Sequence, residues 1–177
     1  MEVFLVRHTT PDIEKGICYG QSDLDVASTF VDEAERITSE LASHTFDAIY
    51  SSPLIRCKKL ANQFQQPVIL DDRLKELDFG DWELKNWNAI PKAESDPWMQ
   101  DFVNVSTKNG ESYVELQQRT IDFYKDIQQQ KHQKVLIVTH AGVIRSLWSY
   151  WHQTPLTNSF DLKVAYGEIL HINTKEL

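Results

Sequence analysis

The sequence predicts an α/β fold, a three-layer αβα sandwich around a mostly parallel central sheet. Two short apolar runs, Val3–Val6 and Val135–Val138, are typical of strands that are buried on both faces. Segments with helical apolar spacing alternate with such runs, which favours helices on both faces of one sheet. A length of 177 residues with 41% apolar side chains is in the ordinary range of one folded unit, so we expect a single domain over residues 1–177.

Helical spacing predicts two helices after the first strand. The apolar positions of the first are Phe30, Ala34, Ile37 and Leu41, and those of the second are Leu54, Cys57, Leu60, Ala61 and Phe64. A strand at Asp47–Tyr50 precedes the second helix, where Ser52 suits the N-cap and Pro53 the first helical position. This assignment places Arg56 in the first helical turn.

Two more helices and a last strand are predicted in the second half of the chain. After Gly110, Ser112 and Glu115 have the spacing of a capping box. A fourth helix follows Gly142, with Val143, Leu147 and Trp151 on its inward face. We expect a final strand or hairpin at about residues 162–172.

The segment 81–109 does not fit this alternation, and we interpret it as a lid-like insertion over the edge of the sheet. Pro91 and Pro97 are expected to break any long helix there. Its large aromatic side chains either pack a small core of their own, which is the commoner role, or offer flat apolar walls to a substrate. They are Trp82, Trp87, Trp98 and Phe102.

Charge and cysteine content narrow the choice of partners and compartment. The chain has 18 basic and 26 acidic residues, a net charge of −8, which disfavours nucleic acid and anionic membranes as partners. No run approaches the ~20 apolar residues of a membrane span. Cys18 and Cys57 form no C-x-x-C pair, so we expect reduced thiols in a cytoplasmic protein. Nothing in the sequence indicates the oligomeric state.

Both predicted buried strands end at a histidine, His8 after the first and His140 after the later one. Because ligands of open α/β sheets bind at the carboxyl edge, we expect both imidazoles at one site. Arg7 and Arg56 can supply forked hydrogen bonds to a phosphate there, and the helix N-termini after Ser52 and His140 can add backbone N–H groups. A zinc site is the alternative for two histidines, but no metal-ligand spacing supports it, and we predict no metal.

The chemistry of such a site requires a nucleophile and a proton donor. A neutral imidazole can attack phosphorus, which makes His8 the expected nucleophile, and His140 can stabilise the charge of the transition state. The acid is expected in the segment Leu74–Glu83, where Leu74, Leu77 and Phe79 give Glu76 an apolar setting. On residue chemistry alone, however, Glu76 cannot be ranked above Asp78, Asp81 and Glu83.

Four separated motifs resemble those of the histidine phosphatase superfamily, also called the phosphoglycerate mutase-like family. They are Leu5-Val6-Arg7-His8, Ser51-Ser52-Pro53-Leu54-Ile55-Arg56-Cys57, Leu74–Glu83 and Val138-Thr139-His140-Ala141-Gly142, and Gly110-Glu111-Ser112 matches a further marker. The resemblance implies that His8 becomes phosphorylated and that Arg7, Arg56 and His140 hold the phosphate. It also implies that Glu76 protonates the leaving group, after which water releases phosphate without any cofactor.

The chain also departs from the family pattern close to the nucleophile. Thr9, Thr10 and Pro11 replace the usual G-E-[ST], and Glu14 stands where many members have a phosphate-binding Asn. An ionised Glu14 would repel phosphate, so we expect it to turn away.

A narrower resemblance rests on residues 16–24, G-I-C-Y-G-Q-S-D-L, which are similar to a motif of the alpha-ribazole-5'-phosphate phosphatases. It implies a small phosphate monoester as substrate, alpha-ribazole 5'-phosphate, in assembly of the cobalamin nucleotide loop. Substrate contacts are then expected from Tyr19, Gly20, Gln21 and Ala141. The base would stack on Trp82, Trp87 or Trp98.

Other functions stay open at this point. One is a phosphatase of another small ester, or a phosphoglycerate mutase, although Asp81–Asp101 carries five acidic and only two basic residues. From other classes, the chain could be a protein phosphohistidine regulator or a non-catalytic phosphate-binding module. The set of His8, Glu76 and His140 argues against a module without activity.

Overall fold

A computed structural model, which describes residues 1–176, shows a sheet of five strands in the order β3-β2-β4-β1-β5. β1, β2, β3 and β4 are parallel to one another where they pair, whereas β5 runs antiparallel to β1. The strands are β1 (Glu2–Arg7), β2 (Ala48–Ser51), β3 (Val68–Leu70), β4 (Lys134–Thr139) and β5 (Ile169–Asn173).

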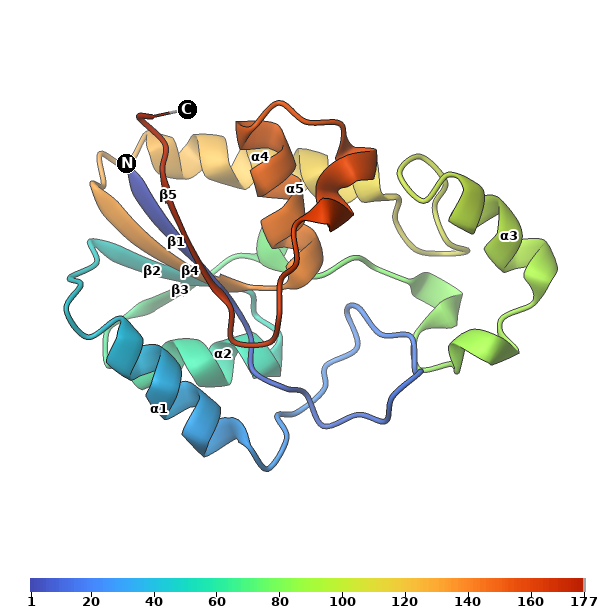
Figure 1. Cartoon of the computed structure of the whole chain (residues 1–177), viewed down its shortest axis with the longest axis horizontal. Coiled ribbons are helices and arrows are strands. Elements are labelled where there is room, and N and C mark those ends of the chain that lie inside the picture. The colour runs from blue at the N-terminus through green and yellow to red at the C-terminus, as the bar shows by residue number, and fades with distance from the viewer. Residues whose placement is uncertain (177) are drawn as a thin grey trace.

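Helices cover both faces of this sheet, which confirms the predicted three-layer α/β fold (Figure 1). α1 (Phe30–Glu40) and α2 (Ile55–Ala61) lie on one face, and α4 (Tyr113–Gln128) and α5 (Ala141–Trp151) on the other. Side chains of β1 alternate between the two layers. Val3 and Leu5 pack with α4 and α5, whereas Phe4 and Val6 pack with α1 and α2.

The capping box predicted at Ser112 is present, because Ser112 and Glu115 exchange hydrogen bonds at the start of α4. The predicted final strand is present but begins later than expected, and two other elements differ from the prediction. The last element is a single strand, β5, and β3 was not predicted because it has only three residues at a half-exposed edge of the sheet. The prediction that α2 begins at Pro53 was wrong, since α2 begins at Ile55 and its N-cap position is Leu54.

A carboxylate from another loop explains the later start of α2. The Ile55 N–H donates to Asp23 Oδ1 over 2.7 Å, while the Ser52 hydroxyl accepts from the Leu54 N–H over 3.3 Å. Asp23 therefore caps the helix in place of Ser52. Arg56 still lies in the first turn of α2.

The segment 81–109 contains more helix than its prolines indicated. It contains η3 (Gly80–Trp82), η4 (Trp87–Ala89) and α3 (Lys92–Gln100), in this order. Figure 1 shows α3 apart from the three layers. Pro91 directly precedes α3, but Pro97 lies inside it, where it removes one backbone donor from a short exposed helix. The remaining short helices are η1 (Asn62–Phe64), η2 (Asp72–Leu74) and η5 (Leu156–Asp161).

The register of the sheet brings the two histidine-bearing strand ends together. Arg7, the last residue of β1, pairs with Thr139, the last residue of β4. His8 and His140 directly follow these two residues at the same edge. β2 ends beside them, because Ser51 pairs with Val138.

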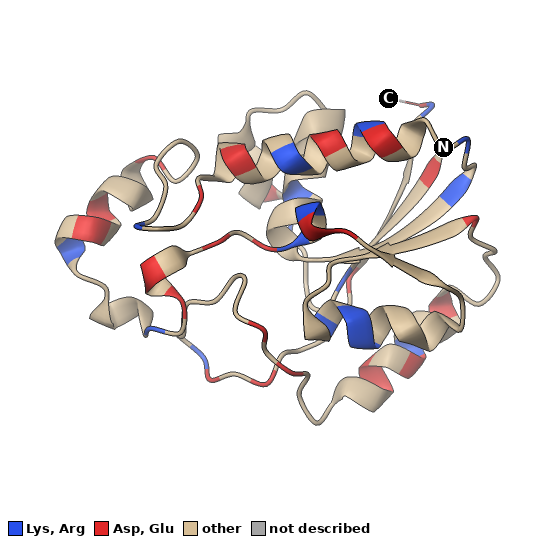
Figure 2. Ribbon diagram, turned by 180° about the vertical axis from the view of Figure 1, so that it is seen from behind, with Lys and Arg blue, Asp and Glu red and all other residues tan. Residues whose placement is uncertain are grey.

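Acidic residues are distributed over the outer segments near this edge of the sheet (Figure 2). They are seen on α3, around η3 and along the loop from β1 to α1, which carries Asp12, Glu14, Asp23 and Asp25. The carboxyl edge of the sheet therefore lies near several acidic segments. Over residues 1–176, no helix has the length and apolar character needed to cross a membrane.

Candidate active site

Two arginines converge on the carboxyl edge of the sheet. Arg56 is fully buried, and its guanidinium donates to the carbonyl oxygens of Ser22 at 2.8 Å and Gly20 at 2.5 Å. Arg7 donates from Nη1 to the Val164 carbonyl at 2.7 Å, while its Nε is buried without a partner among the described residues. A buried N–H without an acceptor is costly, so the geometry of Arg7 favours an anion here.

The ring of His8 lies beside these arginines, and the lone pair of one ring nitrogen is directed toward them. Nδ1 is 2.7 Å from the Thr9 carbonyl oxygen, which can only accept, so Nδ1 carries the proton. The lone pair of Nε2 then faces Arg56 Nε at 3.4 Å. His8 is only 2% exposed. The arrangement prepares Nε2 to attack an atom bound by the arginines.

His140 completes the cluster from the start of α5. Its ring centre is 5.0 Å from that of His8, and its Nδ1 lies 3.3 Å from Arg56 Nη2. Because a guanidinium only donates, this contact places the ring proton on Nε2, which is 2.9 Å from Ser52 Oγ. Cys57 Sγ also lies 3.4 Å from that nitrogen. Ser52 thus orients His140.

Both histidines are held neutral by their surroundings. Burial, followed by the charge of Arg56, lowers the pKa of His8 and of His140 well below the ordinary value of 6.5. Burial also raises the pKa of the neighbouring Cys57 thiol to about 12, so the thiol stays protonated. The cluster therefore carries its positive charge on the arginines alone.

The lowered pKa values predict a loss of stability in mild acid. Below pH 6.5 the unfolded chain binds protons at these two histidines while the folded chain does not, so the free energy of unfolding falls as the pH decreases. Each histidine contributes a slope of up to about 1.4 kcal/mol per pH unit. Urea unfolding between pH 7.5 and 5.5 measures this slope of the free energy of unfolding against pH. The His8→Asn/His140→Asn double variant should flatten the slope, whereas His152→Asn, at an exposed position, should not; a slope unchanged in the double variant would contradict this account.

Glu76 approaches the cluster from the loop after η2, and both of its carboxyl oxygens are fixed by backbone donors. The Leu77 N–H donates to Oε1 over 2.9 Å, and the Gly142 N–H donates to Oε2 over 3.1 Å. The carboxyl group therefore lies against the first turn of α5, directly after His140. Each oxygen keeps a further lone pair that can carry a proton.

The contact with Gly142 offers a selective test of the position of Glu76. In a Gly142→Ala variant the added Cβ would lie 2.2 Å from Glu76 Oε1, so the carboxyl group must move. We expect turnover to fall by about 10²-fold, with little loss of stability because only the end of a side chain is displaced. Steady-state kinetics and thermal melting measure both quantities. Full activity in a folded Gly142→Ala protein would show that the observed position of Glu76 does not matter.

Three backbone donors near the starts of α2 and α5 are already bound within the protein. The Ser52 N–H donates to Val138, the Ile55 N–H to Asp23 and the Gly142 N–H to Glu76. These groups thus hold the site together.

Gly20 and Gln21 also lie outside the wall of the cavity, contrary to the expectation that they meet substrate. Glu83 accepts the N–H groups of both residues, the Gly20 carbonyl accepts from Arg56, and Gln21 Nε2 donates to the Glu76 carbonyl. A Cβ on Gly20 would lie 1.7 Å from the Leu77 carbonyl oxygen, so this close approach requires glycine. We therefore assign Gly20 and Gln21 a positioning role.

Tyr19 and Ala141 do line a cavity of about 250 Å³ that opens at the strand ends. Arg7, His8, Arg56 and Glu76 form one end of it. Most of the rest is apolar and is formed by Ile17, Leu77, Phe79, Trp87, Trp98, Phe102, Tyr113 and Phe160. Glu14 is exposed and absent from the wall, as expected for a carboxylate that would repel phosphate.

The aromatic residues of the segment 81–109 divide between the two roles considered for them. Trp82 is 1% exposed, packs with Cys18 and Ile90, and donates from Nε1 to Glu94 at 3.1 Å. Trp87 and Trp98 face the cavity, with ring centres 6.0 Å apart. Trp82 is thus a core residue, whereas Trp87, Trp98 and Phe102 line the cavity, where a substrate can contact them.

Sequence reasoning missed several residues that shape the site. Glu83 accepts from Gly20, Gln21, Ser22 and Phe79, and Arg119 donates to the carbonyl oxygens of Arg73, Lys75 and Glu76. Two more, Arg145 and Tyr166, lie at or beside the cavity. The motif Leu74–Glu83 ends in W-E and so includes Glu83, but no local sequence signal marks Arg119, Arg145 or Tyr166.

Five groups meet at the carboxyl edge of this α/β sheet. They are a nucleophilic imidazole, two phosphate-binding guanidinium groups, a second histidine and a carboxyl group. Together they define an enzyme of phosphoryl transfer. Comparison with protein families assigns the class more closely: the chain belongs to the histidine phosphatase superfamily (branch 1), whose family model matches residues 3–176. The resemblance seen in the sequence is thereby confirmed, and the chain is a phosphatase of this superfamily.

Several relatives are similar over nearly the full chain. The putative phosphoserine phosphatase 2 of Hydrogenobacter thermophilus is 30% identical, over 97% of this chain and 88% of its own length. The adenosylcobalamin/alpha-ribazole phosphatase of Escherichia coli K12 is 27% identical, over 99% of this chain and 92% of its own. The crystal structure of the alpha-ribazole phosphatase from Shigella flexneri superposes with a TM-score of 0.91 at 25% identity, over 98% of this chain and 90% of that one.

Proposed function

We propose that the protein hydrolyses a small phosphate monoester through a phosphohistidine at His8. One observation carries the proposal: the bond from His8 Nδ1–H to the Thr9 carbonyl leaves the Nε2 lone pair beside buried Arg56 and half-buried Arg7. Arg7 and Arg56 would neutralise the phosphoryl oxygens. Ser52 holds His140 next to His8, on the same edge of the sheet.

The reaction follows in two steps from these positions. His8 Nε2 forms a bond to phosphorus while the bond from phosphorus to the ester oxygen breaks, and Glu76 gives its proton to that leaving oxygen. Water then attacks phosphorus, Glu76 takes the proton of the water, and the bond from nitrogen to phosphorus breaks. His8 is regenerated and inorganic phosphate leaves.

For the substrate we propose alpha-ribazole 5'-phosphate. The cavity beyond the phosphate end is walled mainly by aromatic and aliphatic side chains, which suit a flat apolar base better than a small polar alcohol. Trp87 and Trp98 lie where such a base would stack. The alpha-ribazole phosphatases of Escherichia coli and Shigella flexneri support this choice.

Arg145 gives one specific reason to consider phosphoserine as a second candidate. It lines the same cavity, and its guanidinium packs on Phe160 with 4.7 Å between its central carbon and the ring centre. Nε donates to the Leu162 carbonyl over 3.0 Å, so the group is held in place. A cation beyond the two phosphate arginines can pair with the carboxylate of a phosphorylated amino acid. The Hydrogenobacter thermophilus relative supports this alternative.

A substrate panel distinguishes the two. We expect kcat/KM for alpha-ribazole 5'-phosphate to exceed that for phosphoserine and 3-phosphoglycerate, and Trp98→Leu and Trp87→Leu to lower it by about 10-fold. The same variants should leave kcat/KM for p-nitrophenyl phosphate nearly unchanged. Trp148→Leu, which alters a residue outside the cavity, is the matched control. Preference for phosphoserine, with about a 10²-fold loss in Arg145→Gln, would refute the alpha-ribazole assignment. Equal losses on all esters in the tryptophan variants would refute stacking.

The same experiments decide the remaining alternatives. A mutase would transfer phosphate between phosphoglycerates, and a binding module would bind phosphate without turnover. A protein phosphohistidine regulator would act on a phosphorylated protein and ignore the panel. We also propose a cytoplasmic location, because Cys18 and Cys57 are buried free thiols and reduced thiols are ordinary in that compartment.

A further inference from the structure

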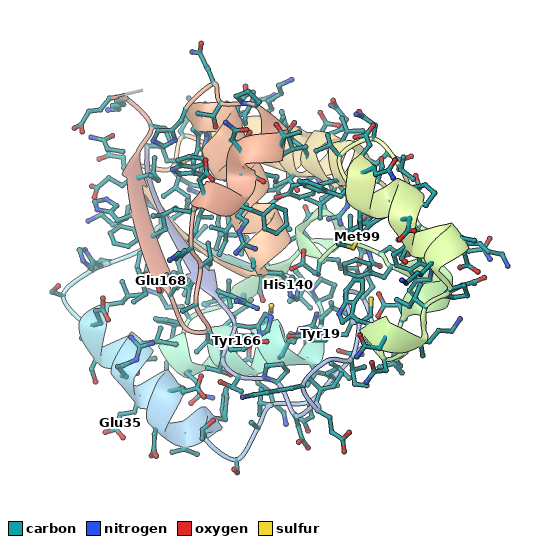
Figure 3. The ribbon with its side chains drawn as sticks, turned by 45° about the vertical axis from the view of Figure 1, so that its right-hand side comes forward. Tyr19, Glu35, Met99, His140, Tyr166 and Glu168 are labelled. Atoms are coloured by element: carbon teal, nitrogen blue, oxygen red, sulfur yellow. The ribbon has the colours of Figure 1, made fainter. Side chains whose placement is uncertain are left out.

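Two tyrosines from distant parts of the chain meet beside the phosphate end of the cavity. Their hydroxyl oxygens, Tyr19 Oη and Tyr166 Oη, are 2.6 Å apart, although the residues are 147 positions apart in sequence. Figure 3 shows both near His140, Tyr19 in the loop after β1 and Tyr166 in the segment before β5. Burial, together with the bond to Tyr166, raises the pKa of Tyr19, so this phenol keeps its proton.

The ring of Tyr166 covers one of the phosphate-binding cations. The central guanidinium carbon of Arg7 lies 3.9 Å from the centre of that ring, and the His8 ring centre lies 5.6 Å from it. Val164, two residues earlier, accepts from Arg7 Nη1. The segment from Val164 to Tyr166 therefore contacts the Arg7 guanidinium twice, with a ring on its flat face and a carbonyl oxygen at its edge. The Arg7 Nε–H stays available to an anion.

The partner tyrosine is attached to a fixed part of the site. The residue after Tyr19 is Gly20, whose carbonyl accepts from buried Arg56 and whose N–H donates to Glu83. The Tyr166 side chain is 37% exposed, and the hydroxyl contact with Tyr19 holds the outer end of its ring. The contact thereby links the loop that anchors Arg56 to the ring that covers Arg7.

We propose that Tyr19 and Tyr166 form a positioning unit for Arg7, in which the hydroxyl bond holds the Tyr166 ring against the guanidinium so that it meets phosphate in a fixed orientation. The inference rests on the proposed function, since it assigns Arg7 to phosphate. Neither tyrosine takes part in bond breaking. Their effect should therefore appear in phosphate affinity and KM more than in the chemical step.

Because one hydrogen bond joins the two hydroxyls, losing either should have the same result as losing both. Tyr19→Phe, Tyr166→Phe and the double variant should each weaken binding of inorganic phosphate and vanadate by about 3- to 10-fold. Tyr166→Leu also removes the ring, and we expect about a 10- to 100-fold loss. Tyr150→Phe, which alters an exposed tyrosine at the far end of α5, should change nothing.

Competitive inhibition by phosphate and by vanadate, with circular dichroism to verify folding, tests the proposal. Effects of Tyr19→Phe and Tyr166→Phe that multiply in the double variant, or an unchanged phosphate affinity in Tyr166→Leu, would overturn it while the phosphatase assignment stands. If Tyr166→Leu fails to fold, the phosphate affinity of Tyr166→Phe, which keeps the ring, still tests the proposal. Failure of the unaltered protein to bind phosphate or turn over any ester would instead sink the proposed function itself.

Discussion

Replacing His8 with alanine should lower turnover of every phosphate monoester by about 10⁴-fold or more, because no other side chain can take over the bond to phosphorus. His140 is close, with ring centres 5.0 Å apart, but its Nδ1 lies beside Arg56 and its Nε2 beside Ser52. His8, by contrast, lines the cavity, and His140 is not among the residues of its wall. The phosphate-binding arginines stay in place, so inorganic phosphate should still bind to the variant.

Steady-state rates and phosphate binding by calorimetry measure the two halves of this prediction. His152→Ala, at an exposed position at the end of α5, serves as the control and should keep full activity. A His8→Ala protein with more than a tenth of the original rate would assign the nucleophile to another group.

Replacing Glu76 with glutamine should lower turnover by about 10²- to 10⁴-fold for an alkyl ester and far less for p-nitrophenyl phosphate. The alkoxide leaving group needs a proton, whereas nitrophenolate is stable without one. Glutamine keeps an oxygen that can accept from Leu77 or Gly142, but it cannot supply the proton. Binding of inorganic phosphate should change little.

The ratio of the two rates, measured with alpha-ribazole 5'-phosphate and p-nitrophenyl phosphate, is the decisive quantity. Glu35→Gln is the matched control, since Figure 3 shows Glu35 on α1, pointing away from the site. Equal losses on both esters would mean that Glu76 acts on the fold or on the phosphate, and some other group would then be the acid.

The main architecture was predictable because its signals are local. Val3–Val6 and Val135–Val138 carry the unbroken apolar pattern of central parallel strands, and the box from Ser112 to Glu115 marks the start of α4 within four residues. β3 carries no comparable signal, because its three residues lie at an edge where burial does not impose a pattern. The start of α2 depends on Asp23, more than 30 positions earlier, and such contacts leave no periodicity.

The reacting groups were predictable from the sequence for a related reason. His8 and His140 follow buried strands directly, and the parallel register brings those ends together. Their supports are set by loops that meet only after folding. Gly20 is tied to Leu77 by close approach and to Glu83 by hydrogen bonding, and Tyr166 reaches Tyr19 across 147 positions. For this reason the sequence predicted substrate contacts for Gly20 and Gln21, which the structure places outside the cavity wall.

Whether His8 Nε2 carries the phosphoryl group during turnover can be measured directly. The protein is mixed with excess ester, stopped with alkali within one turnover, and examined by mass spectrometry of its peptides, since phosphohistidine survives alkali. We expect one added phosphate on the peptide that contains His8, none in His8→Ala, and a longer-lived adduct in Glu76→Gln. Turnover without any phosphorylated peptide, or phosphate on the peptide of His140, would contradict this expectation.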